Sequence, residues 1–303
     1  MTNTKILSSL IIAVYFLNGL PTHASFNKES NVVYGMYSGL ALLMDVYTPE
    51  NSNGYGIIFI NGSGWHAGLE LNTRALKDRP DTLESMGIPL IEEGFTLFFI
   101  NHRSAPRFKM PDIIADAQRA VRFVRHHAER YQIDPGKLTA MGGSSGAHLS
   151  AMLGVMDGKG DPVASDEILR HSAKVQCVVA HAAPADLAAD GTPMFFVTSV
   201  TATIGVRMPR SESEKEVYQE VSPLYHVTPD DAPMLLIHGD QDGTVPFAQS
   251  ELFTAKLKET GVSVTFVPVK GGGHGLTGNI NNAKAGKLPH PKAVADWILK
   301  QLH

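Results

Sequence analysis

A serine framed by glycines follows an apolar stretch near the middle of the chain. Residues 138–141 run into Gly142-Gly143-Ser144-Ser145-Gly146, and residues 147–156 then read as a helix. A strand, a sharp turn and a helix are the context in which a G-x-S-x-G motif exposes a serine hydroxyl above a sheet. The positive end of the helix dipole also lies at this turn. The pattern predicts that Ser144 is a nucleophile and that Ser145 contributes its backbone N–H.

A nucleophilic serine needs a base, and the base needs a carboxylate to orient it. His274 stands among glycines directly after the apolar run 264–269, whereas Asp240 and Asp242 follow the run 234–238. Serine, acid and histidine occur in this chain order when the serine lies on a strand–turn–helix. The residues therefore predict His274 as the base, with either Asp240 or Asp242 as the acid.

A loop after another apolar run has the composition of an oxyanion hole. Residues 57–60 lead into Asn61-Gly62-Ser63-Gly64-Trp65, which can turn backbone N–H groups toward the space above Ser144. Two such donors and the N–H of Ser145 would meet the oxygen of a tetrahedral intermediate, and each is worth about 3 kcal/mol. Trp65 is also a candidate for contact with substrate, although packing explains it equally well.

The elements that carry these residues alternate between strand and helix. Apolar runs typical of strands cover residues 32–37, 42–47, 57–60, 95–100, 138–142, 175–180, 234–238 and 264–269. Helical patterns cover 111–131, 147–156, 251–260 and 292–302. The alternation predicts an α/β fold with a mostly parallel eight-stranded sheet and helices on both faces. The segment 190–222 is the least regular and is expected to be a small lid or cap.

The helical pattern 111–131 has two faces. Small and branched apolar residues recur at spacings of three and four, which predicts one buried stripe. Arg119, Arg122 and Arg125 occupy much of the remainder and are interpreted as a solvated face. One turn into the next helix, His148 is predicted to be a hydrogen-bonded packing residue.

The first 24 residues have the pattern of a secretory signal. Lys5 precedes the apolar run 6–17, and Pro21 and Ala24 follow it. The run is shorter than the roughly 20 residues that span a bilayer. We therefore expect a signal peptide over residues 1–24 and a catalytic domain over 25–303. The mature protein is expected to be secreted or periplasmic, without stable membrane insertion.

Composition excludes some classes of protein. The 303 residues are 43% apolar with a net charge of −4, which argues against a general nucleic-acid binder. No residue cluster has zinc or calcium spacing, so we expect neither a metal nor another cofactor. The single cysteine, Cys177, is predicted to be a small buried residue. The oligomeric state stays open.

Taken together, these segments resemble the HGGG-type serine esterases of the α/β-hydrolase superfamily. That group includes hormone-sensitive-lipase-like carboxylesterases and bacterial carbohydrate acetyl and feruloyl esterases. The resemblance covers nearly all of the chain after residue 24. It lies in segments 33–35 and 43–47, in 61–65 (H-G-G-G-W in the family), in 101–106 (N-Y-R-L-A-P), and in 133–135, 222–224 and 238–246.

The resemblance implies an α/β-hydrolase fold with a small or absent cap. It selects Asp242 over Asp240 as the acid, and it places the oxyanion donors on Ser63, Gly64 and Ser145. The implied activity is hydrolysis of carboxylic esters of short acyl or aromatic acids through a covalent acyl-enzyme. Small-molecule or carbohydrate esters are the implied substrates, with acetylated or feruloylated carbohydrates among them.

Three residues depart from the family pattern. Asn61 stands for the leading histidine of H-G-G-G, Ser63 for its middle glycine, and His102 for the tyrosine of N-Y-R. A serine still supplies a backbone N–H, so these changes bear on acyl specificity more than on hydrolysis.

Three other functions remain as alternatives. An amidase or formamidase would use the same triad. A prolyl-oligopeptidase-like peptidase usually carries a large extra domain. A non-catalytic binding protein of this fold commonly lacks a triad member.

Overall fold

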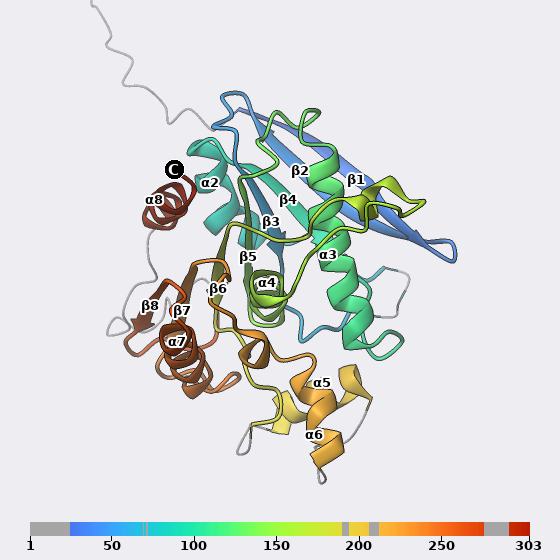
Figure 1. Cartoon of the computed structure of the whole chain (residues 1–303). Coiled ribbons are helices and arrows are strands. Elements are labelled where there is room, and N and C mark those ends of the chain that lie inside the picture. Colours follow the sequence, from blue (N-terminus) through green and yellow to red (C-terminus); the bar gives the residue numbers. More distant parts are fainter. Residues whose placement is uncertain (1–24, 69, 71, 190–193, 206–211, 276–290) are drawn as a thin grey trace, which may run out of the picture.

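The apolar runs of the sequence form one sheet in a computed structural model, which describes residues 25–68, 70, 72–189, 194–205, 212–275 and 291–303. Its eight strands lie in the order β1-β2-β4-β3-β5-β6-β7-β8. The β1–β2 and β2–β4 pairs are antiparallel, and the strands from β4 to β8 pair in parallel. The predicted mostly parallel, eight-stranded sheet is therefore confirmed (Figure 1). The predicted signal segment, residues 1–24, lies outside the described residues and stays a prediction.

The first three strands follow one another, and from β3 onward at least one helix lies between successive strands. The strands are β1 (Phe26–Tyr37), β2 (Leu40–Pro49), β3 (Gly56–Ile60), β4 (Thr96–Asn101), β5 (Leu138–Gly143), β6 (Cys177–His181), β7 (Met234–Gly239) and β8 (Val264–Val269). The α-helices are α1 (Pro80–Thr82), α2 (Ile88–Glu92), α3 (Met110–His126), α4 (Ser145–Val155), α5 (Met194–Ile204), α6 (Glu212–Gln219), α7 (Ala248–Thr260) and α8 (Pro291–Leu302). The π-helical turn η1 (Leu83–Gly87) and the 3₁₀ turns η2 (Glu167–Arg170) and η3 (Pro223–His226) complete the set.

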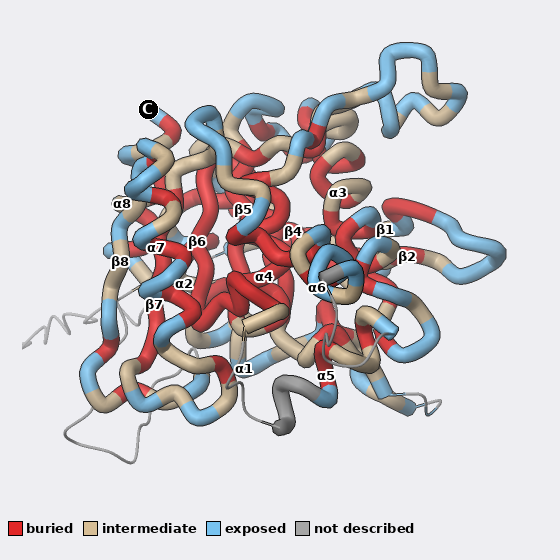
Figure 2. Tube along the Cα trace, turned by 60° about the horizontal axis from the view of Figure 1, so that its bottom comes forward, coloured by how far each residue is buried: buried red, intermediate tan, exposed pale blue. Residues whose placement is uncertain are grey.

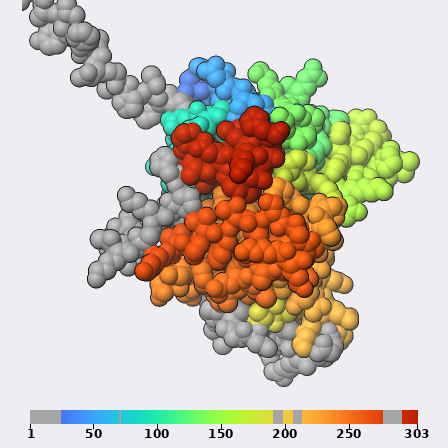
Figure 3. Space-filling view, turned by 60° about the vertical axis from the view of Figure 1, so that its left-hand side comes forward, coloured from blue at the N-terminus to red at the C-terminus, as the bar shows by residue number. Residues whose placement is uncertain are grey.

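The sheet has an apolar core on each face, because successive side chains of a strand point to opposite sides. Ile58 and Ile60 of β3 belong to the core that α3, α4 and α7 cover. Ile57 and Phe59 belong to the other core, which α2 and α8 cover. Figure 2 shows the central strands buried between these layers. Figure 3 shows α8 on the outside of the molecule, beside the segment that contains α2.

The apolar stripe of α3 is buried as predicted, but the arginines on its other side are not a solvated face. Arg119 Nε donates to Tyr34 O at 3.0 Å, and Arg122 Nε donates to His171 O at 3.0 Å. Arg125 Nε donates to Pro135 O at 2.9 Å, and burial lowers the pKa of this guanidinium to about 10. The interpretation was wrong because guanidinium groups also donate to carbonyl oxygens of neighbouring segments, a role that helical spacing does not reveal.

The segment between β6 and β7 contains more regular structure than the sequence indicated. Helices α5 and α6 lie within the stretch 190–222 that had no clear pattern. Figure 1 shows both helices outside the sheet, at the bottom of the view. A second unpredicted helical stretch runs from α1 through η1 to α2, between β3 and β4.

The turn between β5 and α4 brings a helix against a strand at very short range. Ser144 has φ 55° and ψ −123°, a conformation that a non-glycine residue rarely adopts. A Cβ atom at Gly146 would lie 1.9 Å from Ile60 O, and one at Gly142 would lie 2.5 Å from the same oxygen. Glycines at these two positions therefore allow α4, β3 and the turn to meet.

We expect Gly146→Ala to destabilise the protein, because the added methyl overlaps backbone that cannot move aside as a side chain could. Overpacking of this kind costs about 1–3 kcal/mol or more. The midpoint of urea denaturation measures the effect. Gly243→Ala is the matched control, since a Cβ at Gly243 meets no atom within 4 Å. Equal midpoints for the two variants would contradict the close approach.

Candidate active site

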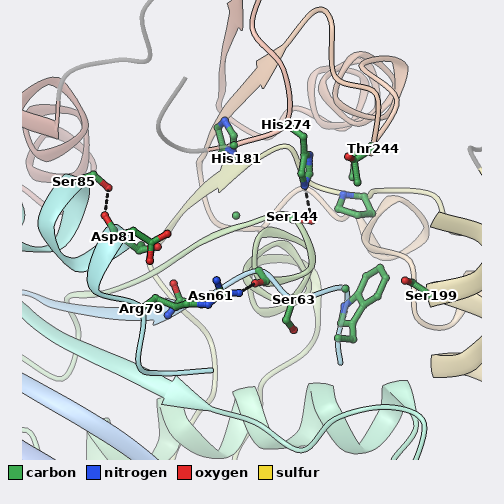
Figure 4. Close-up of a pocket in the computed structure, with 18 residues that line it drawn as sticks. Asn61, Ser63, Arg79, Asp81, Ser85, Ser144, His181, Ser199, Thr244 and His274 are labelled. Atoms are coloured by element: carbon green, nitrogen blue, oxygen red, sulfur yellow. Dashed lines mark hydrogen bonds between the residues drawn. The ribbon is translucent and has the colours of Figure 1, made fainter. Parts of the chain in front are cut away.

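Ser144 lies where the sheet, the helix α4 and the loop after β3 meet. Its hydroxyl faces a cavity of about 460 Å³ whose lining includes Gly62, Trp65, Arg79, His181 and His274 (Figure 4). The backbone N–H of Ser144 donates to His181 O at 2.8 Å, which ties the turn to the end of β6. As the residue that precedes α4, Ser144 also stands at the positive end of the helix dipole.

The structure brings Ser144, His274 and Asp242 together from three strand ends. Ser144 follows β5, Asp242 follows β7 and His274 follows β8. His274 Nε2 lies 3.0 Å from Ser144 Oγ, and His274 Nδ1 lies 2.7 Å from Asp242 Oδ2. Because a carboxylate only accepts, Nδ1 carries the proton and Nε2 presents its lone pair to the serine hydroxyl. This arrangement is suited to removing the serine proton.

The carboxylate of Asp242 is fully buried and receives hydrogen bonds on both oxygens. Oδ1 accepts from the backbone N–H of Thr244 at 2.8 Å and of Val245 at 3.0 Å. Oδ2 accepts from His274 and from His238 Nε2, which lies at 3.1 Å. Burial alone would raise the pKa of Asp242, but these hydrogen bonds outweigh it and hold the pKa well below its ordinary value. The carboxylate is therefore charged throughout the pH range in which His274 can act as a base.

His238 is a part of the site that the sequence reasoning missed. It is the penultimate residue of β7 and is 0% exposed. Its Nε2 faces two acceptors, Asp242 Oδ2 at 3.1 Å and Val245 O at 3.1 Å, so this nitrogen carries the proton. Its Nδ1 then accepts from Ser250 Oγ at 2.7 Å. A histidine four residues before an aspartate was the only signal in the sequence, and it does not distinguish a contact from a coincidence.

The second aspartate after β7 has a different contact. Asp240 Oδ1 accepts from the backbone N–H of Gly271 at 2.6 Å. This bond fixes the turn that precedes His274. The residues alone left Asp240 and Asp242 as equal candidates for the acid, whereas the structure places Asp242 against His274.

The loop after β3 lies directly on the serine turn. A Cβ at Gly62 would lie 2.6 Å from Gly143 O, so only glycine fits there. Of the three N–H groups expected in the oxyanion hole, that of Ser63 donates to Ser145 Oγ at 2.9 Å. Within the described residues, the N–H groups of Gly64 and Ser145 have no acceptor. These two groups are therefore available to an incoming oxygen.

Trp65 closes the oxyanion loop and is held by a buried histidine. Its indole Nε1–H donates to His148 Nδ1 at 3.2 Å, and the two rings meet edge to face. His148 Nε2–H in turn donates to Val221 O at 2.7 Å. Burial lowers the pKa of His148 to about 4, so the ring stays neutral and keeps this pair of bonds. His148 is thus a hydrogen-bonded packing residue, and Trp65 both lines the cavity and packs.

The described residues contain neither a metal-ligand cluster nor a reactive thiol. No group of three or more His, Cys, Asp or Glu side chains lies close enough to hold a metal ion in this part of the chain. Cys177 is buried as predicted, and burial raises the pKa of its thiol to about 12, which makes it a poor nucleophile. None of the described helices is long and apolar enough to cross a membrane.

Comparisons with known proteins cover most of the chain. The BD-FAE family model matches residues 44–257. The esterase LipC of Mycobacterium tuberculosis is 27% identical over 293 residues, which are 94% of this chain and 68% of LipC. The esterase LipQ of the same organism is 28% identical over 240 residues, which are 78% of this chain and 54% of LipQ.

Solved structures agree with these matches. A truncated carbohydrate esterase from gut microbiota has a TM-score of 0.74 and 30% identity, and the superposition covers 93% of this chain and 98% of that one. Esterase Est2 of Thermogutta terrifontis has a TM-score of 0.66 and 25% identity, with 92% of each chain covered. The predicted α/β-hydrolase fold is confirmed.

We expect His238→Phe to move the acid limb of the kcat/KM profile for ester hydrolysis to higher pH. Without the Nε2–H of His238, the charge of Asp242 acts more strongly on His274 and stabilises the imidazolium. A lost hydrogen bond of about 1 kcal/mol corresponds to a movement of about half a pH unit to one unit.

His238→Gln keeps an N–H donor and is expected to restore the limb toward the wild-type position. If His238→Phe lowers kcat but leaves the acid limb in place, His238 supports the fold and does not tune Asp242.

Proposed function

The chain belongs to the BD-FAE family, and we propose that Ser144, His274 and Asp242 hydrolyse esters of short acyl groups carried by a hydroxylated alcohol such as a sugar. Its relatives are named as esterases, which confirms the prediction of a carboxylic ester hydrolase. The observation that carries the assignment of residues is the contact of one imidazole with both Ser144 Oγ and Asp242 Oδ2.

The reaction proceeds in two steps. Nε2 of His274 takes the proton of Ser144 as Oγ attacks the ester carbonyl, and Asp242 stabilises the resulting imidazolium. The carbonyl oxygen becomes negative and is met by the N–H groups of Gly64 and Ser145. His274 then protonates the departing alcohol, which leaves an acyl group on Ser144. Water, activated by the same imidazole, releases the acid and restores the serine.

Three observations support the substrate class. A volume of about 460 Å³ lies within the range of small-molecule sites and accommodates a short acyl chain together with a sugar-sized alcohol. The cavity is also polar on one side, where Arg79, Asp81 and Ser85 lie (Figure 4). The solved relative at 30% identity is named as a carbohydrate esterase.

We expect Ser144→Ala to lower the turnover of p-nitrophenyl acetate by about 10⁴-fold or more, since the variant cannot form an acyl-enzyme. Wild-type activity is expected to be highest on acetate or butyrate and lowest on octanoate. Ser150→Ala is the matched control, because Ser150 lies on α4 directly after the serine turn and its hydroxyl donates to Gly146 O at 2.9 Å.

A fluorophosphonate probe provides an independent measurement. Peptide mass mapping should place the adduct on Ser144 in the wild type and in Ser150→Ala. Equal turnover by Ser144→Ala and the wild type would refute the nucleophile. Hydrolysis of the matched p-nitroanilides at the rate of the esters would favour the amidase alternative.

We propose that residues 1–24 direct export and are then removed. Lys5, the apolar run and the small residues near Ala24 support this proposal. N-terminal sequencing of the protein recovered outside the cytoplasm is expected to begin at or near Ser25. Recovery of the uncleaved chain from the cytoplasm alone would contradict it.

A further inference from the structure

One buried histidine of the cavity has no part in the proposed mechanism. His181 is the last residue of β6, is 3% exposed and lines the cavity. Its backbone is engaged, because Ser144 N–H donates to its carbonyl oxygen at 2.8 Å. Among the described residues, no group forms a hydrogen bond with its ring nitrogens. A polar ring thus lines the cavity that Ser144 faces, and no described group bonds to its nitrogens.

Because the ring lines the cavity, a substrate group that enters can form hydrogen bonds with its nitrogens. Burial, with the nearby imidazoles of His238 and His274, lowers the pKa of His181 to about 3. The ring is therefore neutral at any pH where His274 can act as a base. A neutral imidazole has one donor and one acceptor nitrogen, which matches the two hydrogen-bonding functions of a hydroxyl group.

The position of His181 indicates which half of the substrate it meets. The departing alcohol must take its proton from His274 Nε2, which lies 3.0 Å from Ser144 Oγ. Figure 4 shows His181 beside His274, on the side of the cavity where Asp81 and Ser85 lie and away from Ser199. Whatever is attached to the departing oxygen therefore passes close to His181.

We propose that His181 is a specificity-determining residue for the alcohol half of the substrate: its ring bonds a hydroxyl next to the esterified one. The enzyme then favours monoesters of vicinal diols, which include sugars, over esters of simple alcohols with the same acyl group. This inference rests on the proposed ester hydrolysis and adds the residue that binds the alcohol half of the substrate.

A pair of esters that differ by one hydroxyl tests the inference. The kcat/KM values for trans-2-hydroxycyclohexyl acetate and cyclohexyl acetate are each divided by the rate constant for alkaline hydrolysis, which removes the difference in intrinsic reactivity. We expect a wild-type ratio of about ten or more, since one hydrogen bond of about 1.4 kcal/mol is a factor of ten.

His181→Phe keeps a ring of similar size without nitrogen atoms, and we expect its ratio to fall to about one. His181→Gln retains a donor and an acceptor and should recover part of the preference. His226→Phe is the control, because His226 lies outside the cavity and bonds to Glu220 O at 2.9 Å.

A wild-type ratio near one overturns the inference. So does a His181→Phe variant that loses activity on both esters equally, because the residue then acts on the triad and not on the alcohol. Failure of the proposed function gives a different result, because the wild type would then be inactive on both cyclohexyl esters and on p-nitrophenyl acetate.

Discussion

The site depends on the hydrogen bonds that hold the buried carboxylate of Asp242. Burying a charged group is costly unless hydrogen bonds replace its water. Here the replacement comes from four donors: His274, His238 and the backbone N–H groups of Thr244 and Val245. The two backbone donors lie in the turn after β7, and His238 lies in β7 itself. The fourth donor, His274, is the base, and the carboxylate orients it. The hydrogen bonds that replace water around this one buried charge therefore also set the position of His274, which accepts the proton of Ser144.

Much of the fold could be predicted because a sheet with helices on both faces has a clear sequence pattern. Strands buried on both faces are continuous apolar runs, and the chain turns at glycines where reactive side chains are presented. The stripe of α3 was equally visible, since one face of that helix is apolar. The short helical stretch around η1 was not, because a π-helical turn followed by only five α-helical residues has too little periodicity.

What could not be predicted depends on partners distant in sequence. Ser63 and Ser145 are 82 residues apart, and their hydrogen bond withdraws one expected donor from the oxyanion loop. The arginines of α3 bind carbonyl groups of other segments, which no local pattern encodes. His238 looked like an ordinary strand residue, and only its two acceptors reveal what its ring does.

The three residues that depart from the family pattern differ in their contacts. Asn61 Nδ2 donates to Leu76 O at 2.8 Å, which ties the oxyanion loop to the segment before α1. His102 is buried beside Arg103, whose guanidinium donates three hydrogen bonds to the carboxylate of Asp116 of α3 at 2.8, 2.9 and 3.0 Å. Asn61 thus connects the oxyanion loop to the segment before α1, whereas His102 Nε2 and Ser63 Oγ are buried without a hydrogen-bond partner among the described residues.

The chain of bonds from Trp65 through His148 to Val221 has a consequence for how such a protein can diversify. The stretch between β6 and β7 lies outside the sheet and would otherwise be a convenient place for insertions and exchanges. Here it contains Val221, whose carbonyl accepts a hydrogen bond from His148, and His148 in turn holds Trp65 of the oxyanion loop. A graft that replaced this stretch with one from another enzyme would have to bring a matching carbonyl, or the loop it supports would need to be transplanted with it.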